Sequence, residues 1–91
     1  MNIEWDPKKA ASSLRKHRVS FHEAVTVLED PLSTTFPDPD HSLSENRYLT
    51  IGQSSSGRIL VVAHADRGNA VRLITARRAT RGERKFYEEG K

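Results

Sequence analysis

The chain has 91 residues, 35% hydrophobic and 30% charged, and its formal net charge is +3 at pH 7, so we expect one domain, residues 1–91, with a modest core and an ion-rich surface. It contains no cysteine, which excludes disulfides, thiolate zinc sites, iron–sulfur clusters and cysteine nucleophiles. It has neither a signal-peptide start nor an apolar run of membrane-spanning length, and we expect a cytoplasmic protein that does not contact a membrane.

The N-terminal residues predict a short strand and then a helix. Residues 2–5 can form the strand, and the helix is expected over residues 7–17. Asp6 and Pro7 mark its start, because the carboxylate caps free N–H groups and proline already has a helical φ angle. The basic side chains of this helix are expected largely on its outer surface, opposite the apolar face.

A second helix is expected only two or three residues after the first. Ser20 and Glu23 have the spacing of a capping box, in which each side chain bonds to the backbone of the other residue. Asp30 and Pro31 end the helix, because proline disfavours helical geometry in the residue before it. The core face of the helix is predicted from apolar residues at helical spacing: Phe21, Ala24, Val25 and Leu28.

Four strands are predicted in the rest of the chain. They are expected over residues 32–36, 47–53, 59–65, and 70–77 or 70–78. Short turns join the last three, so these strands suit antiparallel hairpins. The polar loop that begins at Pro37 is too rich in proline for regular pairing and is expected at the surface.

The fold class follows from the strand pattern and a last helix. Residues 59–65 are apolar on both faces of the pleat, so this strand is expected at the centre of the sheet. Thr80 and Glu83 form a second capping-box pattern, from which a helix is expected to run to about Glu89. The predicted order is βααββββα, an α+β domain whose antiparallel sheet is flanked by helices.

Charge is divided unequally along the chain. Residues 29–45 carry acids and no lysine or arginine, whereas residues 58–85 are strongly basic and contain only two acids, Asp66 and Glu83. Guanidinium groups offer paired donors that match phosphate oxygens, so the basic segment suits a nucleic-acid partner. A solvated charged face is the alternative that composition leaves open. The basic residues are Arg58, Arg67, Arg72, Arg77, Arg78, Arg81, Arg84 and Lys85.

The strongest candidate for chemistry is the point where the last strand meets the last helix. Arg77 and Arg78 are adjacent in the strand, so their side chains point to opposite faces of the sheet. The helix start at Thr80 adds N–H donors and positive potential, which attract a phosphate. The alternative is that the two arginines pair with Glu83 or with the acidic loop.

A histidine lies near the end of the predicted central strand. His64 shares a face with Leu60 and Val62. It is either a hydrogen-bonded core residue or a proton carrier that neighbouring strands bring near Arg77. The other histidines are expected at a helix end, on a helix surface and in a loop: His17, His22 and His41.

No metal or cofactor site is expected. Asp38, Asp40 and His41 are ligand types, but their proline-spaced loop lacks the spacing of a zinc or calcium site. Gly57 and Gly68 are isolated in turns and do not form a glycine-rich phosphate loop. The sequence therefore favours an activity that depends on side chains alone.

Four ordered stretches cover nearly the whole chain from Glu4 to Gly90. They are EWDPKKAASSLRKHRVSFHEAVTVLEDPL, FPDPDHS, RYLTIGQSSSGRILVVAHADRG and RLITARRATRGERKFYEEG. In this order they closely resemble the BrnT family of type II toxins. The resemblance implies a RelE-like fold and metal-independent cleavage of RNA, such as mRNA at the ribosome, which arrests translation. It also implies neutralisation by a BrnA antitoxin that brings a DNA-binding module for the operator, and hence a hetero-oligomer.

The resemblance also implies roles for individual residues. Arg77 and Arg78 match the family's paired arginines at the end of the last strand, and His64 and Arg67 match its central-strand histidine and the following turn. In the implied reaction the ribose 2′-OH attacks the adjacent phosphate while basic side chains hold the developing charge. A non-cleaving RNA- or ribosome-binding module and a corepressor subunit remain alternatives. The predicted RNA contacts are Arg58, Arg72, Arg81 and Tyr87.

Overall fold

The computed structural model describes residues 2–40 and 46–90, so His41 and Glu45 of the acidic loop lie outside the described residues. The elements follow in the order β1 (Asn2–Trp5), α1 (Pro7–His17), α2 (Phe21–Leu28), β2 (Thr34–Pro37), β3 (Arg47–Gln53), β4 (Ile59–Arg67), β5 (Ala70–Arg78) and α3 (Arg81–Glu89). This is the α+β order that the sequence predicts. None of the helices in the described ranges is long and apolar enough to span a membrane.

The bounds of two strands differ from the prediction. β2 begins later than expected and includes Pro37, which pairs with Tyr48 at the sheet edge. An edge strand tolerates proline because no further strand needs its N–H group. The next residue, Asp38, was expected in a surface loop, yet it is only 8% exposed. β4 extends to Arg67, which shortens the predicted turn.

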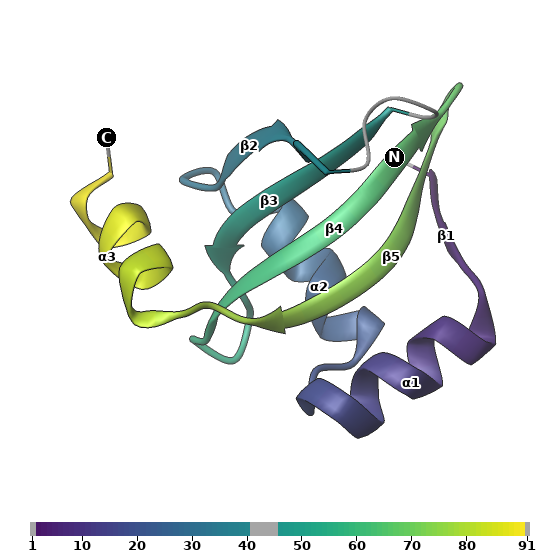
Figure 1. The fold of residues 1–91 in the computed structure, drawn as a ribbon, viewed down its shortest axis with the longest axis horizontal. Coiled ribbons are helices and arrows are strands. Elements are labelled where there is room, and N and C mark those ends of the chain that lie inside the picture. The colour runs from purple at the N-terminus through teal and green to yellow at the C-terminus, as the bar shows by residue number, and fades with distance from the viewer. Residues whose placement is uncertain (1, 41–45, 91) are drawn as a thin grey trace.

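The strands form one mixed sheet in the order β1-β5-β4-β3-β2. The prediction of an antiparallel sheet holds for β2 to β5 but is wrong for β1, which pairs with β5 in parallel. Since most of the chain separates these two strands, no hairpin fixes their relative direction. In Figure 1, α2 lies behind the sheet, α1 lies below it next to β5, and α3 stands beside it beyond the end of β5.

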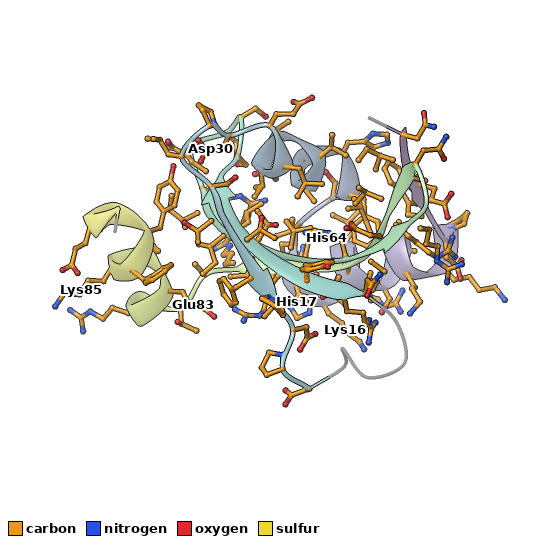
Figure 2. All side chains as sticks on the ribbon, turned by 90° about the horizontal axis from the view of Figure 1, so that it is seen from above. Lys16, His17, Asp30, His64, Glu83 and Lys85 are labelled. Carbon is orange, nitrogen blue, oxygen red and sulfur yellow. The ribbon has the colours of Figure 1, made fainter. Side chains whose placement is uncertain are left out.

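The core lies on both faces of β4, the central strand. One face packs against α1 and α2, and Figure 2 shows the sheet curving around α2, with His64 near its middle. The other face packs against Tyr87 of α3. This double cover explains why residues 59–63 of β4 are apolar on both faces. The buried side chains under α1 and α2 are Val19, Phe21, Ala24, Val27, Leu60, Val62, Leu73 and Ala76; those on the other face are Ile51, Val61 and Ala79.

The first two helices begin at the predicted caps, but one cap is only half formed. Asp6 accepts a hydrogen bond from the Lys8 N–H at 2.8 Å, and α1 ends at Arg18 in the left-handed conformation, with φ 59°. Ser20 accepts from the Glu23 N–H at 3.0 Å. The Glu23 carboxylate does not complete the predicted capping box, because it is directed instead to Arg58, the residue just before β4.

Beyond the end of β1, α1 takes over the hydrogen bonds of the β5 edge. β1 ends opposite Leu73, and further along β5 the Ser13 Oγ donates to the Ala76 carbonyl at 2.9 Å and accepts from the Ala76 N–H at 3.3 Å. Ser13 is itself buried. A serine on the helix thus replaces a neighbouring strand and fixes α1 against the sheet.

Candidate nucleic-acid interface

The predicted pair at the end of β5 divides between the two faces of the sheet. Arg77 pairs with Val61 and Arg78 with Leu60 in the β4–β5 ladder, so their side chains point in opposite directions, as alternation predicts. Arg77 donates from both terminal nitrogens to the Glu83 carboxylate, at 2.8 and 2.9 Å. The alternative partner named by the sequence is therefore the one that Arg77 contacts.

Glu83 also occupies the start of α3. Its Oε1 accepts from the Thr80 N–H at 2.8 Å, and the Thr80 hydroxyl accepts from the Glu83 N–H at 3.2 Å, which completes the predicted capping box. The hydrogen bond from Arg77 is the main cause that lowers the pKa of Glu83 to about 2. A carboxylate thus lies where the sequence led us to expect a phosphate, and Arg77 joins β5 to α3.

Arg78 remains exposed and lines a pocket at the end of the sheet. The pocket has a volume of about 360 Å³ and lies between α3 and the turn from β3 to β4. Arg58 and Arg84 contribute to its walls, and Glu88 is its acidic member. We call it the end pocket; its remaining lining residues are Gln53, Gly57, Ile59 and Ala79.

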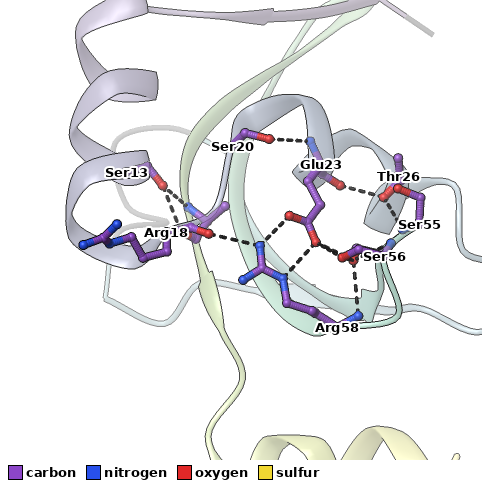
Figure 3. A network of polar contacts seen from close by, with 10 residues as sticks. Ser13, Arg18, Ser20, Glu23, Thr26, Ser55, Ser56 and Arg58 are labelled. Atoms are coloured by element: carbon purple, nitrogen blue, oxygen red, sulfur yellow. Dashed lines mark hydrogen bonds and ion pairs between the residues drawn. The ribbon is translucent and has the colours of Figure 1, made fainter.

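Arg58 is held mainly by the fold. Its Nε donates to Glu23 at 3.0 Å, one terminal nitrogen contacts the same carboxylate, and that nitrogen also donates to the Arg18 carbonyl at 3.0 Å (Figure 3). The hydrogen bond from Arg58, assisted by Ser54 and Ser56, lowers the pKa of Glu23 to about 2 against the effect of burial. This network fastens the β3–β4 turn to α2.

His64 occupies a buried position, only 6% exposed, on the face covered by α1 and α2. Its Nε2 is hydrogen-bonded to the Thr50 hydroxyl at 2.8 Å, and Thr50 to the Thr35 hydroxyl at 2.7 Å. The Tyr48 ring stacks on it with centroids 6.0 Å apart. Burial lowers the pKa of His64, and the charge of Asp66 opposes this only in part. His64 and Arg77 lie on opposite faces, so the structure does not bring them together.

The remaining predicted residues are spread along the molecule. Arg67 ends β4 at the hairpin, and Arg72 pairs with Glu4 at 3.2 Å between partly exposed side chains. Arg81 is exposed at the start of α3. The Tyr87 hydroxyl donates to Asp30 at 2.6 Å, and this hydrogen bond raises the pKa of Tyr87 to about 12. Tyr87 therefore holds α3 against the end of α2.

Two adjoining hollows open around the middle of β5. One, of about 180 Å³, is lined by α1 side chains together with Ile74 and Thr75. The other, of about 370 Å³, lies over Leu49 and Ala63 and shares the same two residues of β5. We call the pair the cross-sheet groove. The other α1 residues that line it are Lys9, Ser12, Ser13, Lys16 and His17, and those of the second hollow are Asp38, Asp40 and Arg47.

A β-bulge shapes the floor of this groove. Ala63 pairs with Thr75 but His64 pairs with Leu73, so Ile74 is an extra residue in β5. Bulges bend a strand and re-aim the side chains beside it. Thr75 and Arg77 consequently face away from α2 while Leu73 enters the core. In Figure 2, Lys16 and His17 also lie on the side of the sheet turned away from α2.

The sequence did not identify Lys9, Lys16, His17 or Arg47 as site residues. The available signal was the run of basic residues between 8 and 18 without a single acid. From the sequence alone, these side chains are expected on the outer surface of the helix. Only the packing of α1 along β5, which the sequence does not reveal, turns part of that surface toward the groove. Among residues 2–40 and 46–90, no three histidine or carboxylate side chains gather as metal ligands would.

The chain resembles known proteins in sequence and in fold. A family model described as the ribonuclease toxin BrnT of type II toxin–antitoxin systems matches residues 5–83. The crystal structure of the Brucella abortus ribonuclease toxin BrnT is similar to this chain with a TM-score of 0.71 and 25% sequence identity, and the match covers 89% of this chain and 99% of that one. No curated protein matches the chain.

Proposed function

The chain belongs to the BrnT family of ribonuclease toxins of type II toxin–antitoxin systems, and from this premise we propose that it is a metal-independent, RelE-like endoribonuclease that cleaves mRNA and so inhibits translation. The observation that carries the proposal is the cross-sheet groove, whose α1 wall is cationic. A groove with one basic wall suits a single RNA strand, because the RNA phosphates require neutralisation and the bases are unpaired.

The proposed reaction needs only the RNA and protein side chains. The ribose 2′-oxygen bonds to the adjacent phosphorus and loses its proton to a base, while the bond to the 5′-oxygen breaks and that oxygen gains a proton. The products are a 2′,3′-cyclic phosphate and a free 5′-hydroxyl. Negative charge grows on the non-bridging oxygens during this step, so fixed cations stabilise the transition state more than the bound substrate.

We propose different roles for the predicted residues, according to their positions in the fold. Arg77 lies two residues from Thr75 on the same face of β5, about 7 Å along the strand, which suits a cation beside the reacting phosphate. Arg78 in the end pocket suits RNA beyond the cleavage point. Arg67 and Arg72, at the hairpin end, suit RNA on the opposite side, whereas His64 supports the fold.

The test uses purified protein and an end-labelled single-stranded RNA in excess chelator. We expect cleavage that yields cyclic-phosphate ends and does not occur at a 2′-deoxy position. Arg78→Ala should remain folded, because an exposed arginine contributes little to stability, and should weaken binding of an uncleavable 2′-O-methyl RNA. Loss of cleavage in chelator, restored by a divalent ion, would contradict metal independence.

A non-cleaving RNA-binding module or corepressor gives a different result in the same assay. Such a protein would bind the RNA but leave it intact after prolonged incubation at high protein concentration. The basic side chains of the end pocket and of the α1 side of the cross-sheet groove would fit that function equally well, because RNA binding requires only phosphate neutralisation. Cleavage products with 2′,3′-cyclic phosphate ends therefore separate the two functions.

The proposed partner is a BrnA-like antitoxin in the cytoplasm. A type II toxin is neutralised by a protein, and the basic segment from Arg58 to Lys85 favours an acidic, amphipathic segment as the covering element. We propose that the resulting hetero-oligomer contacts operator DNA only through the antitoxin. Co-purification of the two chains, followed by operator binding with and without the antitoxin, tests this assembly.

A further inference from the structure

We propose that α1 supplies the centre of the cleavage site: the reacting phosphate lies over Thr75 against Lys9 and Lys16, and His17 takes the proton from the 2′-OH. This inference rests on the proposed ribonuclease function and names residues for it. The juxtaposition that carries it is the smaller hollow of the cross-sheet groove, in which these α1 side chains meet Thr75 of β5.

His17 is the histidine whose position suits proton transfer. His64 is buried against Thr50 on the opposite face. His22 is exposed on α2 and contacts the Trp5 ring edge-on, with centroids 5.1 Å apart. Of the three histidines that the described ranges contain, His17 alone lines the groove. An imidazole beside an open groove can reach a bound ligand and act as a general base.

The two hollows of the groove differ in charge. The α1 hollow is lined by two lysines and no carboxylate. The adjoining hollow contains Asp38 and Asp40 beside Arg47, so its acids outnumber its basic residue. A phosphate is therefore attracted to the α1 hollow and repelled from the neighbouring one. This difference places the phosphodiester under α1 and leaves the other hollow for uncharged parts of the nucleotide.

Local structure holds the proposed residues in place. Lys9, Ser13 and Lys16 follow at helical spacing, so their side chains share one face of α1. Ser13 is clamped to both backbone groups of Ala76, the residue after Thr75. The bulge at Ile74 turns Thr75 toward the same hollow. The rotation of α1 about its axis is thereby fixed relative to β5, which gives the two lysines and His17 a defined orientation.

The chemistry balances with these groups alone. The His17 imidazole accepts the 2′-OH proton as the 2′-oxygen bonds to phosphorus, and the departing 5′-oxygen receives a proton from water. His17 then returns its proton to solvent. Lys9 and Lys16 hold the non-bridging oxygens while their negative charge increases.

The first test compares His17→Gln with the matched control His22→Gln. Glutamine retains hydrogen bonding but does not transfer protons. We expect His17→Gln to cleave RNA about 10²- to 10⁴-fold more slowly, in the range of a lost general base, with the rise of rate with pH removed. His22→Gln should cleave within about 2-fold of the parent, since it lies outside the groove. Binding of a 2′-O-methyl RNA should change little in either variant.

The second test does not depend on how His17→Gln folds. Lys9 and Lys16 are exposed, so the double variant Lys9→Ala/Lys16→Ala should fold normally. It should bind the 2′-O-methyl RNA more weakly, and the slope of log affinity against log salt should fall by about 1.4, as expected for two lost phosphate contacts on a single strand. A matched double variant on the same helix, Lys8→Ala/Arg15→Ala, removes two exposed cations that do not line the groove and should show a smaller change.

The outcomes separate this inference from the function on which it rests. If the parent protein fails to cleave RNA, the proposed function is wrong before any variant is compared. If the parent cleaves and either His17→Gln keeps its rate and pH profile or the lysine variant keeps its affinity and salt slope, the site under α1 is wrong. Cleavage by the parent with both expected losses supports it.

Discussion

At His64 a titratable side chain takes part in a row of hydrogen bonds across three strands. Thr35, Thr50 and His64 come from β2, β3 and β4 and bond in sequence at 2.7 and 2.8 Å. Burial lowers the pKa of the imidazole in the folded protein, so the folded state resists a proton that the unfolded chain accepts below its ordinary pKa of 6.5. Stability should therefore be lost as pH falls below about 6.5.

His64→Gln tests this linkage. The parent's free energy of unfolding in urea should fall between pH 7 and pH 5, and His64→Gln should reduce that fall, because the variant lacks the buried imidazole. At pH 7 the variant should itself be less stable, since a shaped buried side chain is replaced. His22→Gln serves as the control. If all three proteins lose the same stability between these two pH values, His64 does not cause the dependence.

Glu23 gives a pH dependence of the same sign, but at lower pH. Its pKa falls from 4.5 to about 2 on folding, chiefly through the hydrogen bond from Arg58. The corresponding stability is present above pH 4.5 and is lost as pH falls toward 2. Glu23→Gln should cost about 1.5–3 kcal/mol at pH 7, the range for hydrogen bonds to a charged group, and less at pH 3.

The matched control for Glu23 is Glu29→Gln, which alters an exposed carboxylate just beyond the same helix. We expect its unfolding free energy to stay within about 0.5 kcal/mol of the parent at both pH values. If both variants lose the same unfolding free energy at pH 7, the contact between Glu23 and Arg58 does not stabilise the fold more than an exposed carboxylate does.

At the scale of elements, the sequence predicted well what neighbouring residues determine. Helix starts at Asp6, Ser20 and Thr80 follow from side chains that cap the next turn, and the central place of β4 follows from its apolar faces. These signals act over a few residues. Long-range contacts decide the rest, as the Glu23 carboxylate shows by preferring Arg58, which lies 35 positions away.

The candidate site was harder to predict than the fold for the same reason. Alternation correctly separated Arg77 from Arg78, but nothing local decides whether Arg77 contacts a phosphate or Glu83. The groove depends on a bulge at Ile74 and on the packing of α1 along β5. Neither has a sequence pattern of its own, so the side chains of α1 were not assigned to the site.

The clamp between α1 and β5 gives a prediction at this scale. Ser13→Ala removes both hydrogen bonds to Ala76 in a buried place and should cost about 1–3 kcal/mol of unfolding free energy. Hydrogen exchange at the Ala76 amide should become faster. Ser12→Ala, one residue earlier and half-buried, should leave that amide protected. An unchanged exchange rate in Ser13→Ala would mean that the β5 edge is protected by other contacts.

Across the whole molecule, acidic and basic residues are concentrated in different segments of the chain. Residues 58 to 85 are rich in arginine, and two of these arginines, Arg78 and Arg84, line the end pocket. Opposite potential accelerates association and fixes its register. We expect the rate of association with the proposed BrnA-like antitoxin to fall as salt increases. Arg84→Glu should slow association further, whereas Glu29→Lys should not.

Stopped-flow mixing at low and high salt measures this effect. Dissociation should depend on salt much less than association does, because steering acts before contact. An association rate independent of salt, or an interface mapped to Asp38 and Asp40, would contradict the charge argument.

The parallel pairing of β1 with β5 has a consequence for synthesis of the chain. Asn2 finds its partner Ala70 only after 68 further residues have been added. Contacts of such long range close late, and until then the first strand and helix lack the edge on which they pack. The groove also takes Ile74 and Thr75 from β5. A growing chain therefore carries the basic helix before the groove of the proposed cleavage site can form, because that groove requires β5.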